Sequence, residues 1–310
     1  MALTTTARPA SGRPAPAAPR NPGPSWGYRF LRTADQILPE PIYRPLRGVG
    51  TAIALARMPE QRRHSRAYLR QVLGREPRAG DVFRHFFAFE EALMLRLRVA
   101  NGRHVPCRYG PGTEDFAAWM GSDTPAFLGT MHIGVSDTLG FQLAGKSTRP
   151  IFIVRQRVAN SHDTEALCAR FGERLRLIWV NEGRDLLFEL KSAVEAGGTV
   201  ALQCDRLEFS TRTEAFEFLG ARRLFSVTIY HLALLFDRPV LLAVGVPDGP
   251  NATRLHASPR FTRHAGEGRA ETLARAHDHF QAFLRDIERL LRASPYWWFN
   301  FTPLNPSVAG

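Results

Sequence analysis

From about residue 125 onward, short apolar runs alternate with segments of helical periodicity, and this alternation constrains the fold more than any other feature. The apolar runs are PAFLGTM, PIFIVR, LRLIWV, TVALQCD and PVLLAVGV. Helical patterns lie between them at about 135–144, 184–195 and 224–236, and a long one follows at about 268–292. Strands that alternate with helices favour right-handed crossovers and parallel pairing. We therefore predict an α/β fold with a mostly parallel central sheet flanked by helices, and functional groups at the carboxyl ends of its strands.

The chain before these runs divides into two parts of different composition. Residues 1–24 are rich in Pro and Ala, which predicts a disordered tail. Apolar residues at spacings of three and four predict a helical N-terminal subdomain over 25–110, and the α/β core is expected over 111–310. Aromatic and basic residues alternate within 26–53, a mixture that suits a membrane interface. Ordinary amphipathic helices packed on the core explain the same pattern equally well.

The formal net charge of +12 is nearly all arginine, because Lys146 and Lys191 are the only lysines. Such a surface attracts nucleic acid, an anionic membrane or an acidic carrier protein, although a GC-rich genome produces the same arginine excess. No zinc-finger, helix-turn-helix or RNA-binding signature is present, so nucleic acid is not an expected partner. Three cysteines without close pairing suggest neither a disulfide framework nor a structural zinc site.

Membrane crossing and secretion are both unexpected from the sequence. No apolar run approaches the roughly 18 residues that a transmembrane helix needs. The N-terminus also lacks a basic flank followed by an apolar stretch. We therefore expect the chain to stay on the cytoplasmic side.

One segment, from Met131 to Asp137, places a histidine and a carboxylate where the first clear core strand gives way to a helix. His132 and Asp137 can meet only if His132 lies in the turn before the helix and Asp137 lies in its first turns. Gly134 eases such a turn. A carboxylate on one imidazole nitrogen leaves the other free to take a proton from an attacking hydroxyl. The amides at the helix N-terminus are candidate donors to a developing negative charge.

Further motifs follow in order along the chain. They are a strand with an arginine, Ile151–Arg155; a Gly-Arg pair before a helix, Gly183 and Arg184; a Leu, spacer and Gly leading to a strand with an aspartate, Leu190, Gly198 and Asp205; the segment Phe218-Leu219-Gly220; and Pro295-Tyr296-Trp297-Trp298-Phe299. Over about residues 60–300 this order and spacing, with the His132 to Asp137 motif, resembles the bacterial lipid A late acyltransferases. These lauroyl and myristoyl acyltransferases belong to the lysophospholipid acyltransferase superfamily.

The resemblance implies a peripheral acyltransferase at the cytoplasmic face of the inner membrane, with His132 as general base and Asp137 as its orienter. It implies an acyl carrier protein thioester as donor, with acyl-CoA as the alternative, and a lipid acceptor. Neither a metal, a cofactor nor a covalent acyl-enzyme is implied, and no Gly-x-Ser-x-Gly elbow is present. The chain departs from the family at Asp205-Arg206, where the family commonly has Asp-Gln, and at Asn300-Phe301, where the family has a His-Arg-Arg-Trp block.

Five other residues are predicted to bind substrate: Glu182, Arg184, Arg155, Asp205 and Arg206. An arginine at a strand end or a helix start offers a bidentate fork to a phosphate or carboxylate. Each of these arginines is equally well explained by a structural ion pair. Asp205 and Arg206 are also interpreted as an ion pair that shapes the cleft, and Glu182 as a helix-start carboxylate.

The sequence leaves two alternatives to an acyltransferase open. One is a non-catalytic protein that binds anionic lipid or acyl carrier protein through the same arginines. The other is a nucleic-acid-binding protein, which the missing motifs disfavour. Within the enzyme class, the acceptor remains open between a lipid A-like disaccharide, an amino-acid lipid, a glycolipid and a membrane-anchored secondary metabolite.

Overall fold

The computed structural model describes residues 25–146, 149–157, 168–182, 185–207, 210, 212–249 and 252–308, so the expected disordered tail, 1–24, lies outside it. The helices are α1 (Ser25–Ile37), α2 (Glu40–Arg57), α3 (Pro59–Leu73), α4 (Ala79–Ala100), α5 (Glu114–Met120), α6 (Ser136–Lys146), the 3-10 helix Gly172–Arg174, α8 (Leu186–Glu195), α9 (Thr228–Phe236) and α10 (Arg269–Ala293). The strands are β1 (Cys107–Tyr109), β2 (Phe127–Thr130), β3 (Ile151–Arg155), β4 (Leu175–Trp179), β5 (Thr199–Gln203), β6 (Thr213–Phe218), β7 (Ala221–Ser226), β8 (Val240–Pro247) and β9 (Thr253–Ala257).

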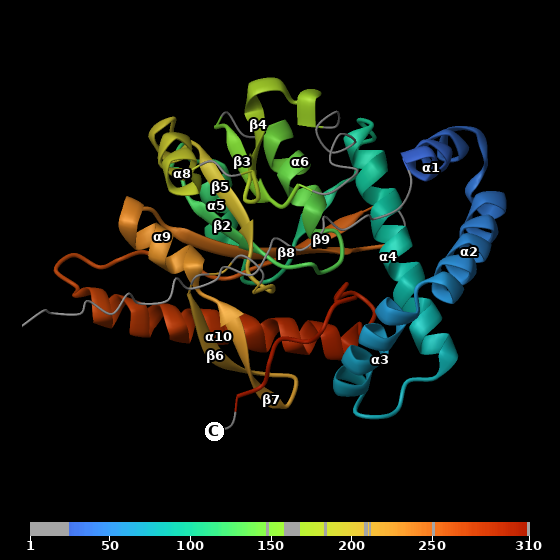
Figure 1. Cartoon of the computed structure of the whole chain (residues 1–310). Coiled ribbons are helices and arrows are strands. Elements are labelled where there is room, and N and C mark those ends of the chain that lie inside the picture. The colour runs from blue at the N-terminus through green and yellow to red at the C-terminus, as the bar shows by residue number, and fades with distance from the viewer. Residues whose placement is uncertain are drawn as a thin grey trace, which may run out of the picture.

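The centre of the molecule is a seven-stranded sheet in the order β1-β9-β8-β2-β5-β3-β4 (Figure 1). All neighbouring pairs are parallel except β8 with β9. The five predicted strands are β2, β3, β4, β5 and β8, and the predicted α/β class with a mostly parallel sheet is confirmed. The sequence analysis did not predict the short edge strand β1 or its neighbour β9.

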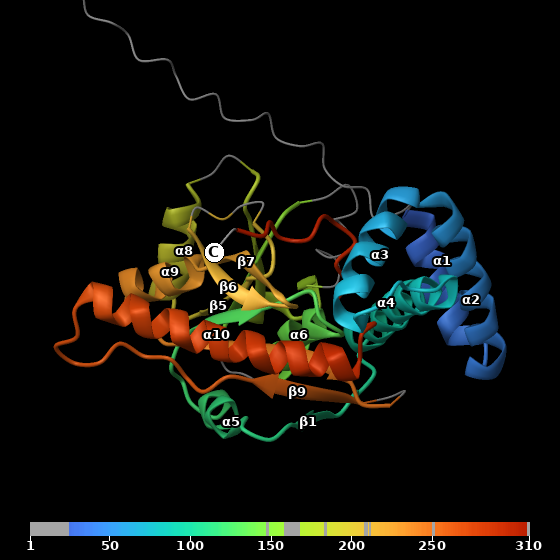
Figure 2. The ribbon, with the colours of Figure 1, turned by 90° about the horizontal axis from the view of Figure 1, so that it is seen from below.

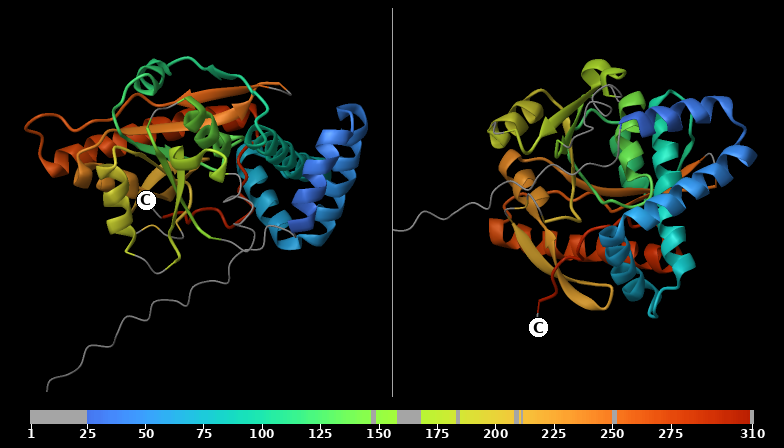
Figure 3. Two further views of the ribbon diagram at one scale, coloured as in Figure 1. Left: turned by 90° about the horizontal axis from the view of Figure 1, so that it is seen from above. Right: turned by 45° about the vertical axis from the view of Figure 1, so that its right-hand side comes forward.

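Alternating side chains along the buried strands pack on two different sets of helices. In β8, Val240 and Leu242 pack with residues of α8, α9 and α10. The intervening Leu241 and Ala243 pack with residues of α5 and α6. Helices therefore cover both faces of the sheet, and the views from below and above show α10 running along one side of it (Figures 2 and 3). This arrangement follows from the period of two in strand side chains.

The segment before α9 is a β-hairpin, where the sequence predicted a helix over about 224–236. Strands β6 and β7 pair antiparallel and the helix begins only at Thr228. Leu219 and Gly220 connect the strands with φ of 51° and 73°, the left-handed conformations of a two-residue hairpin turn. The helical prediction for 224–227 was wrong. The run LFSV fits the helical period and the strand period equally well, and pairing with β6 makes it a strand.

Helices α1–α4 lie together beside the sheet (Figure 1). Residues of α3 and α4, including Tyr68 and Phe86, join the same apolar cluster as the sheet residues Phe127 and Val200. The predicted helices of the N-terminal region are therefore present, and α3 and α4 share the central core. None of the helices in the described part of the chain has the length and apolar character needed to cross a membrane.

Candidate active site

The pairing register of β2 and β5 brings His132 and Asp205 together. Thr130 of β2 pairs with Gln203 of β5, so the residues two positions further on face each other beyond the strand ends. His132 Nδ1 lies 2.9 Å from Asp205 Oδ1, and the His132 backbone N–H donates to Asp205 Oδ2 at 3.1 Å. Two neighbouring parallel strands thus place an imidazole and a carboxylate at the edge of the sheet where α/β proteins gather functional groups.

A tight turn between β2 and α6 holds His132 outside the helix. Gly134 adopts φ of 52°, and a Cβ there would lie 2.5 Å from the Gly245 carbonyl oxygen, so only glycine fits. Ser136, the first residue of α6, donates its hydroxyl to the Ile133 carbonyl at 2.6 Å and accepts the Gly245 N–H at 3.1 Å. The predicted location of His132 in the turn and of Asp137 in the first turn of the helix is confirmed.

The aromatic C-terminal tail forms one wall of this site. Trp298 Nε1 donates to Asp205 Oδ2 at 2.9 Å, and the Phe299 N–H donates to the His132 carbonyl at 2.8 Å. The Trp298 ring is 2% exposed and makes edge contacts with Tyr68 and Phe218. The tail and the hairpin turn therefore fix the carboxylate that contacts His132.

Charge at the pair is concentrated on the buried carboxylate. Burial raises the pKa of Asp205, but the nearby His132 and Arg206 charges and the hydrogen bonds from His132 and Trp298 outweigh it and hold that pKa below its usual range. Asp205 therefore stays ionised and accepts a hydrogen bond from the N–H at Nδ1, which leaves Nε2 as the ring nitrogen that can accept a proton. The His132 side chain is 24% exposed, against 2% for Asp205. Among the residues described, none is within hydrogen-bonding distance of Nε2.

The orienting carboxylate found at Nδ1 is Asp205, whereas the sequence assigned this role to Asp137 and gave Asp205 a substrate-binding role. Asp137 occupies the second position of α6, and its side chain lies outside what the structure describes. Its role as orienter stays a prediction. The sequence could not indicate that Asp205 contacts His132. Two other strands lie between β2 and β5 along the chain, and only the strand order of the sheet makes them neighbours.

Several amides in the turn before α6 and at its start, where the sequence predicted donors to a developing negative charge, already have backbone partners. The Gly134 N–H donates to the Trp297 carbonyl, and the Val135 N–H donates to the Gly245 carbonyl. The N–H groups of Ser136 and Thr138 likewise have backbone partners. The first two amides pair with the C-terminal tail and with β8, and the other two pair within the turn, so these four are not free donors. The role of the helix N-terminus as an oxyanion site stays a prediction.

The remaining predicted site residues are spread along the same edge of the sheet. Arg155 ends β3 and pairs in register with Trp179 at the end of β4. Glu182 forms an ion pair with Arg157, whose guanidinium also lies 4.4 Å from the centre of the Trp179 ring. The sequence analysis considered a structural ion pair for the arginines and a helix-start role for Glu182, so this ion pair of Glu182 was not predicted. Arg184 lies outside the described residues.

Three site residues escaped the sequence analysis as functional groups. They are Trp298, Asn305, whose side-chain amide donates to the Asp205 carbonyl at 3.2 Å, and His85. His85 is buried on α4, where Nε2 contacts the Trp298 carbonyl at 2.8 Å and Nδ1 contacts the Ser65 hydroxyl at 2.8 Å. For His85, the only sequence signal was a histidine on an apolar helix face. That signal does not reveal its contact with Trp298, more than 200 positions away.

Two further observations bear on the chemistry available. Burial raises the pKa of the Cys204 thiol, which precedes Asp205, so this cysteine is held in its neutral, weakly nucleophilic form. Within the described ranges, no three His, Cys, Asp or Glu side chains gather as a metal site would require. The oriented pair of His132 and Asp205 is the described feature suited to moving a proton.

Comparison of the chain with protein-family models gives no match. Comparison with curated proteins also gives none. The class that the fold and the site define is therefore an α/β protein with a histidine and aspartate pair at the carboxyl edge of a mostly parallel sheet.

Proposed function

We propose that this protein is an acyltransferase that moves a fatty acyl chain from a thioester to a hydroxyl or amine of a lipid. The observation that carries the proposal is the His132 and Asp205 pair, with Nδ1 held at 2.9 Å and the imidazole still partly exposed. A partly exposed imidazole whose other ring nitrogen is held by a carboxylate suits the deprotonation of an incoming nucleophile. The motif order that resembles the lipid A late acyltransferases supports the same class.

In the proposed reaction, His132 Nε2 takes the proton of the acceptor hydroxyl or amine as its oxygen or nitrogen attacks the thioester carbonyl. Asp205 stabilises the imidazolium that forms. The tetrahedral intermediate then collapses, the carbon–sulfur bond breaks, and the imidazolium returns its proton to the leaving thiolate. The acyl chain ends on the acceptor as an ester or amide, and the thiol is released. A thioester is already activated, so positioning and proton transfer carry most of the catalysis.

Arginines along the site edge suit the phosphate groups of the expected donors. Acyl carrier protein and CoA both present a phosphopantetheine arm, and the carrier protein is acidic. Arg155 is the last residue of β3, and Arg157 and Arg206 lie just beyond the ends of β3 and β5. Since neighbouring strands lie roughly 5 Å apart, β3 is about 10 Å from the strand that carries His132. This spacing suits a thioester whose carbonyl reaches the imidazole while its phosphate contacts an arginine.

The test compares lipids of cells that carry the wild-type protein with those of cells that carry His132→Ala. Mass spectrometry of total lipid extracts is expected to show an acylated product only with the wild type, which also identifies the acceptor. The purified variant should retain the wild-type circular dichroism spectrum. Near-normal product with folded His132→Ala contradicts the mechanism.

A second arm separates an enzyme from the binding-protein alternative. Purified protein is given palmitoyl acyl carrier protein or palmitoyl-CoA together with vesicles made from the total lipid extract. The thioester from which palmitoyl transfer is observed is the donor. Saturable binding of a thioester by the wild type, without turnover under either condition, favours a non-catalytic protein.

A further inference from the structure

Helix α2 carries a row of apolar side chains that face away from the body of the protein. These residues, here called the α2 stripe, are Ile42, Leu46, Val49 and Ile53, which are 57%, 52%, 59% and 51% exposed. Their spacings of four, three and four place them along one face of the helix. Exposed apolar residues scattered singly are normal on a protein surface, but a continuous row of this kind marks an interaction site.

The opposite side of α2 already has its partner. Tyr43, Arg47 and Thr51 are buried, and Arg47 forms ion pairs with Glu90 of α4 and with Glu40. The helix is thus held against α4 through one face. The α2 stripe is therefore not the face by which the helix packs in the described chain.

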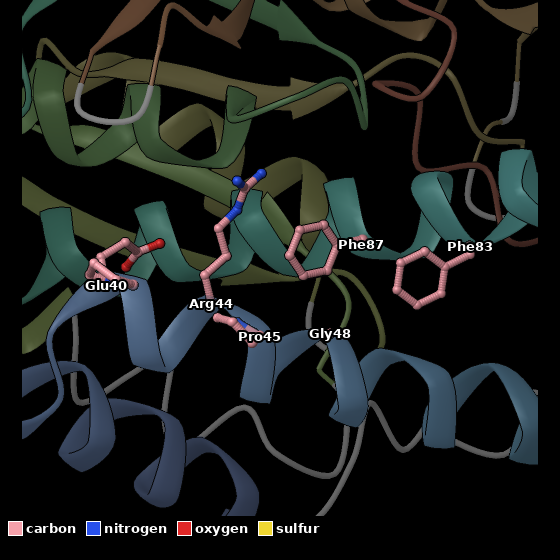
Figure 4. Close-up of a pocket in the computed structure, with 7 residues that line it drawn as sticks. Glu40, Arg44, Pro45, Gly48, Phe83 and Phe87 are labelled. Carbon is pink, nitrogen blue, oxygen red and sulfur yellow. The ribbon is translucent and has the colours of Figure 1, made fainter.

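A groove beside the stripe extends the apolar surface. It lies between α2 and α4 with a volume of about 570 Å³ (Figure 4). Its lining residues are Glu40, Pro41, Arg44, Pro45, Gly48, Phe83 and Phe87. Pro45 and Gly48 directly precede or adjoin stripe residues along the helix, and Phe83 and Phe87 stack with ring centres 6.0 Å apart. Successive residues of a helix point about 100° apart, so the groove borders the stripe on the neighbouring face of α2.

The helices that present this region are strongly basic. Residues 25–74, which hold α1, α2 and α3, contain nine arginines against three carboxylates, a formal charge of +6. Arg57 in the last turn of α2 and Arg63 and Arg66 of α3 are exposed. An apolar face on a basic helix pair is what an anionic membrane surface binds. A second copy of the chain would instead oppose two surfaces of the same sign, which disfavours association.

We propose that the α2 stripe and the adjoining groove dock on an anionic lipid bilayer, with α2 lying in the interface. The bilayer covers the exposed apolar side chains, and arginines of α1–α3 contact lipid phosphates. This proposal goes beyond the acyl-transfer chemistry, because it concerns a surface that lies on other elements than His132 and Asp205 and holds for any reaction at that site.

The test measures co-sedimentation of the full chain with vesicles of phosphatidylglycerol and phosphatidylcholine, against vesicles of phosphatidylcholine alone. The wild type is expected to bind the anionic vesicles and to lose affinity as salt is raised. Leu46→Ser is expected to weaken binding about tenfold, because the side chain no longer transfers from water to the interface. The triple variant Ile42→Ser, Leu46→Ser, Val49→Ser should weaken it by roughly 100-fold or more.

Leu235→Ser is the matched control, because Leu235 of α9 is 60% exposed but lies outside α1–α4. It should bind vesicles like the wild type, and so should His132→Ala, which separates docking from catalysis. All variants should keep the wild-type circular dichroism spectrum, because the replaced apolar side chains are exposed and the His132 side chain is only partly buried. Unchanged binding by the folded triple variant overturns the proposal. A wild-type dimer that the triple variant dissociates assigns the stripe to a second copy and overturns it as well.

Discussion

Replacing Asp205 with asparagine tests the His132 and Asp205 pair without changing its size. Asp205 Oδ1 accepts from His132 Nδ1, while Oδ2 accepts from the His132 N–H and from Trp298 Nε1. An asparagine has one acceptor oxygen and one donor NH₂. The amide oxygen accepts two hydrogen bonds at the Oδ2 position but only one at the Oδ1 position. The oxygen therefore takes the Oδ2 position, and the NH₂ faces His132 Nδ1. His132 then moves its proton to Nε2 and loses the basic nitrogen that faces solvent.

The magnitude follows from the role of that nitrogen. Loss of a general base through the wrong tautomer lowers a rate by roughly 10³- to 10⁴-fold. At about 1.36 kcal/mol for each factor of ten, this equals roughly 4 to 5.5 kcal/mol of transition-state stabilisation. The fold should be affected much less, by about 1 to 2 kcal/mol, because the amide keeps two hydrogen bonds and removes a buried charge.

The assay is single-turnover acyl transfer with the donor identified above, together with nitrogen NMR of the His132 ring to report its tautomer. Asp205→Asn should combine a slow transfer step with a proton on Nε2. Asp137→Asn is the matched comparison, since the sequence assigned the orienting role to Asp137. A folded Asp205→Asn that keeps more than about a tenth of the wild-type rate refutes the reasoning, because no base with a misplaced proton retains that much.

Two further predictions concern the tail that supports the pair. Trp298→Phe removes one donor to Asp205 and should lower kcat/KM about tenfold, with the loss in kcat rather than in KM. A loss confined to KM contradicts a role in positioning Asp205. Burial lowers the pKa of His85 to about 4, although its contact with the Trp298 carbonyl opposes this. Because the pKa of His85 is lower in the folded protein than the unfolded value of about 6.5, the folded state keeps its full stability above pH ~6.5. As the pH falls from there toward 4, the free energy of unfolding decreases by up to about 3 kcal/mol. Denaturant unfolding of wild type and His85→Gln over this range should show the wild type losing more stability, and parallel pH curves contradict it.

Local patterns in the sequence determined the elements of the sheet and most helices. Apolar runs bounded by polar residues predicted β2, β3, β4, β5 and β8, and their alternation with helices predicted parallel pairing. The turn at Gly134 was also predictable, because a histidine, a glycine and the start of a helix are neighbours in the chain. These features depend on interactions within a few residues, which a sequence displays directly.

The site itself depended on contacts between distant segments. His132 meets Asp205 because β2 and β5 are adjacent and in register, and Trp298 meets Asp205 because the C-terminal tail returns to the turn before α6. The backbone partners of the Gly134 and Val135 amides, and the β-hairpin before α9, were likewise decided by pairing across the fold. Sheet order and register arise from the packing of the whole core, so the residue types that the sequence supplied acquired their partners only in the tertiary structure.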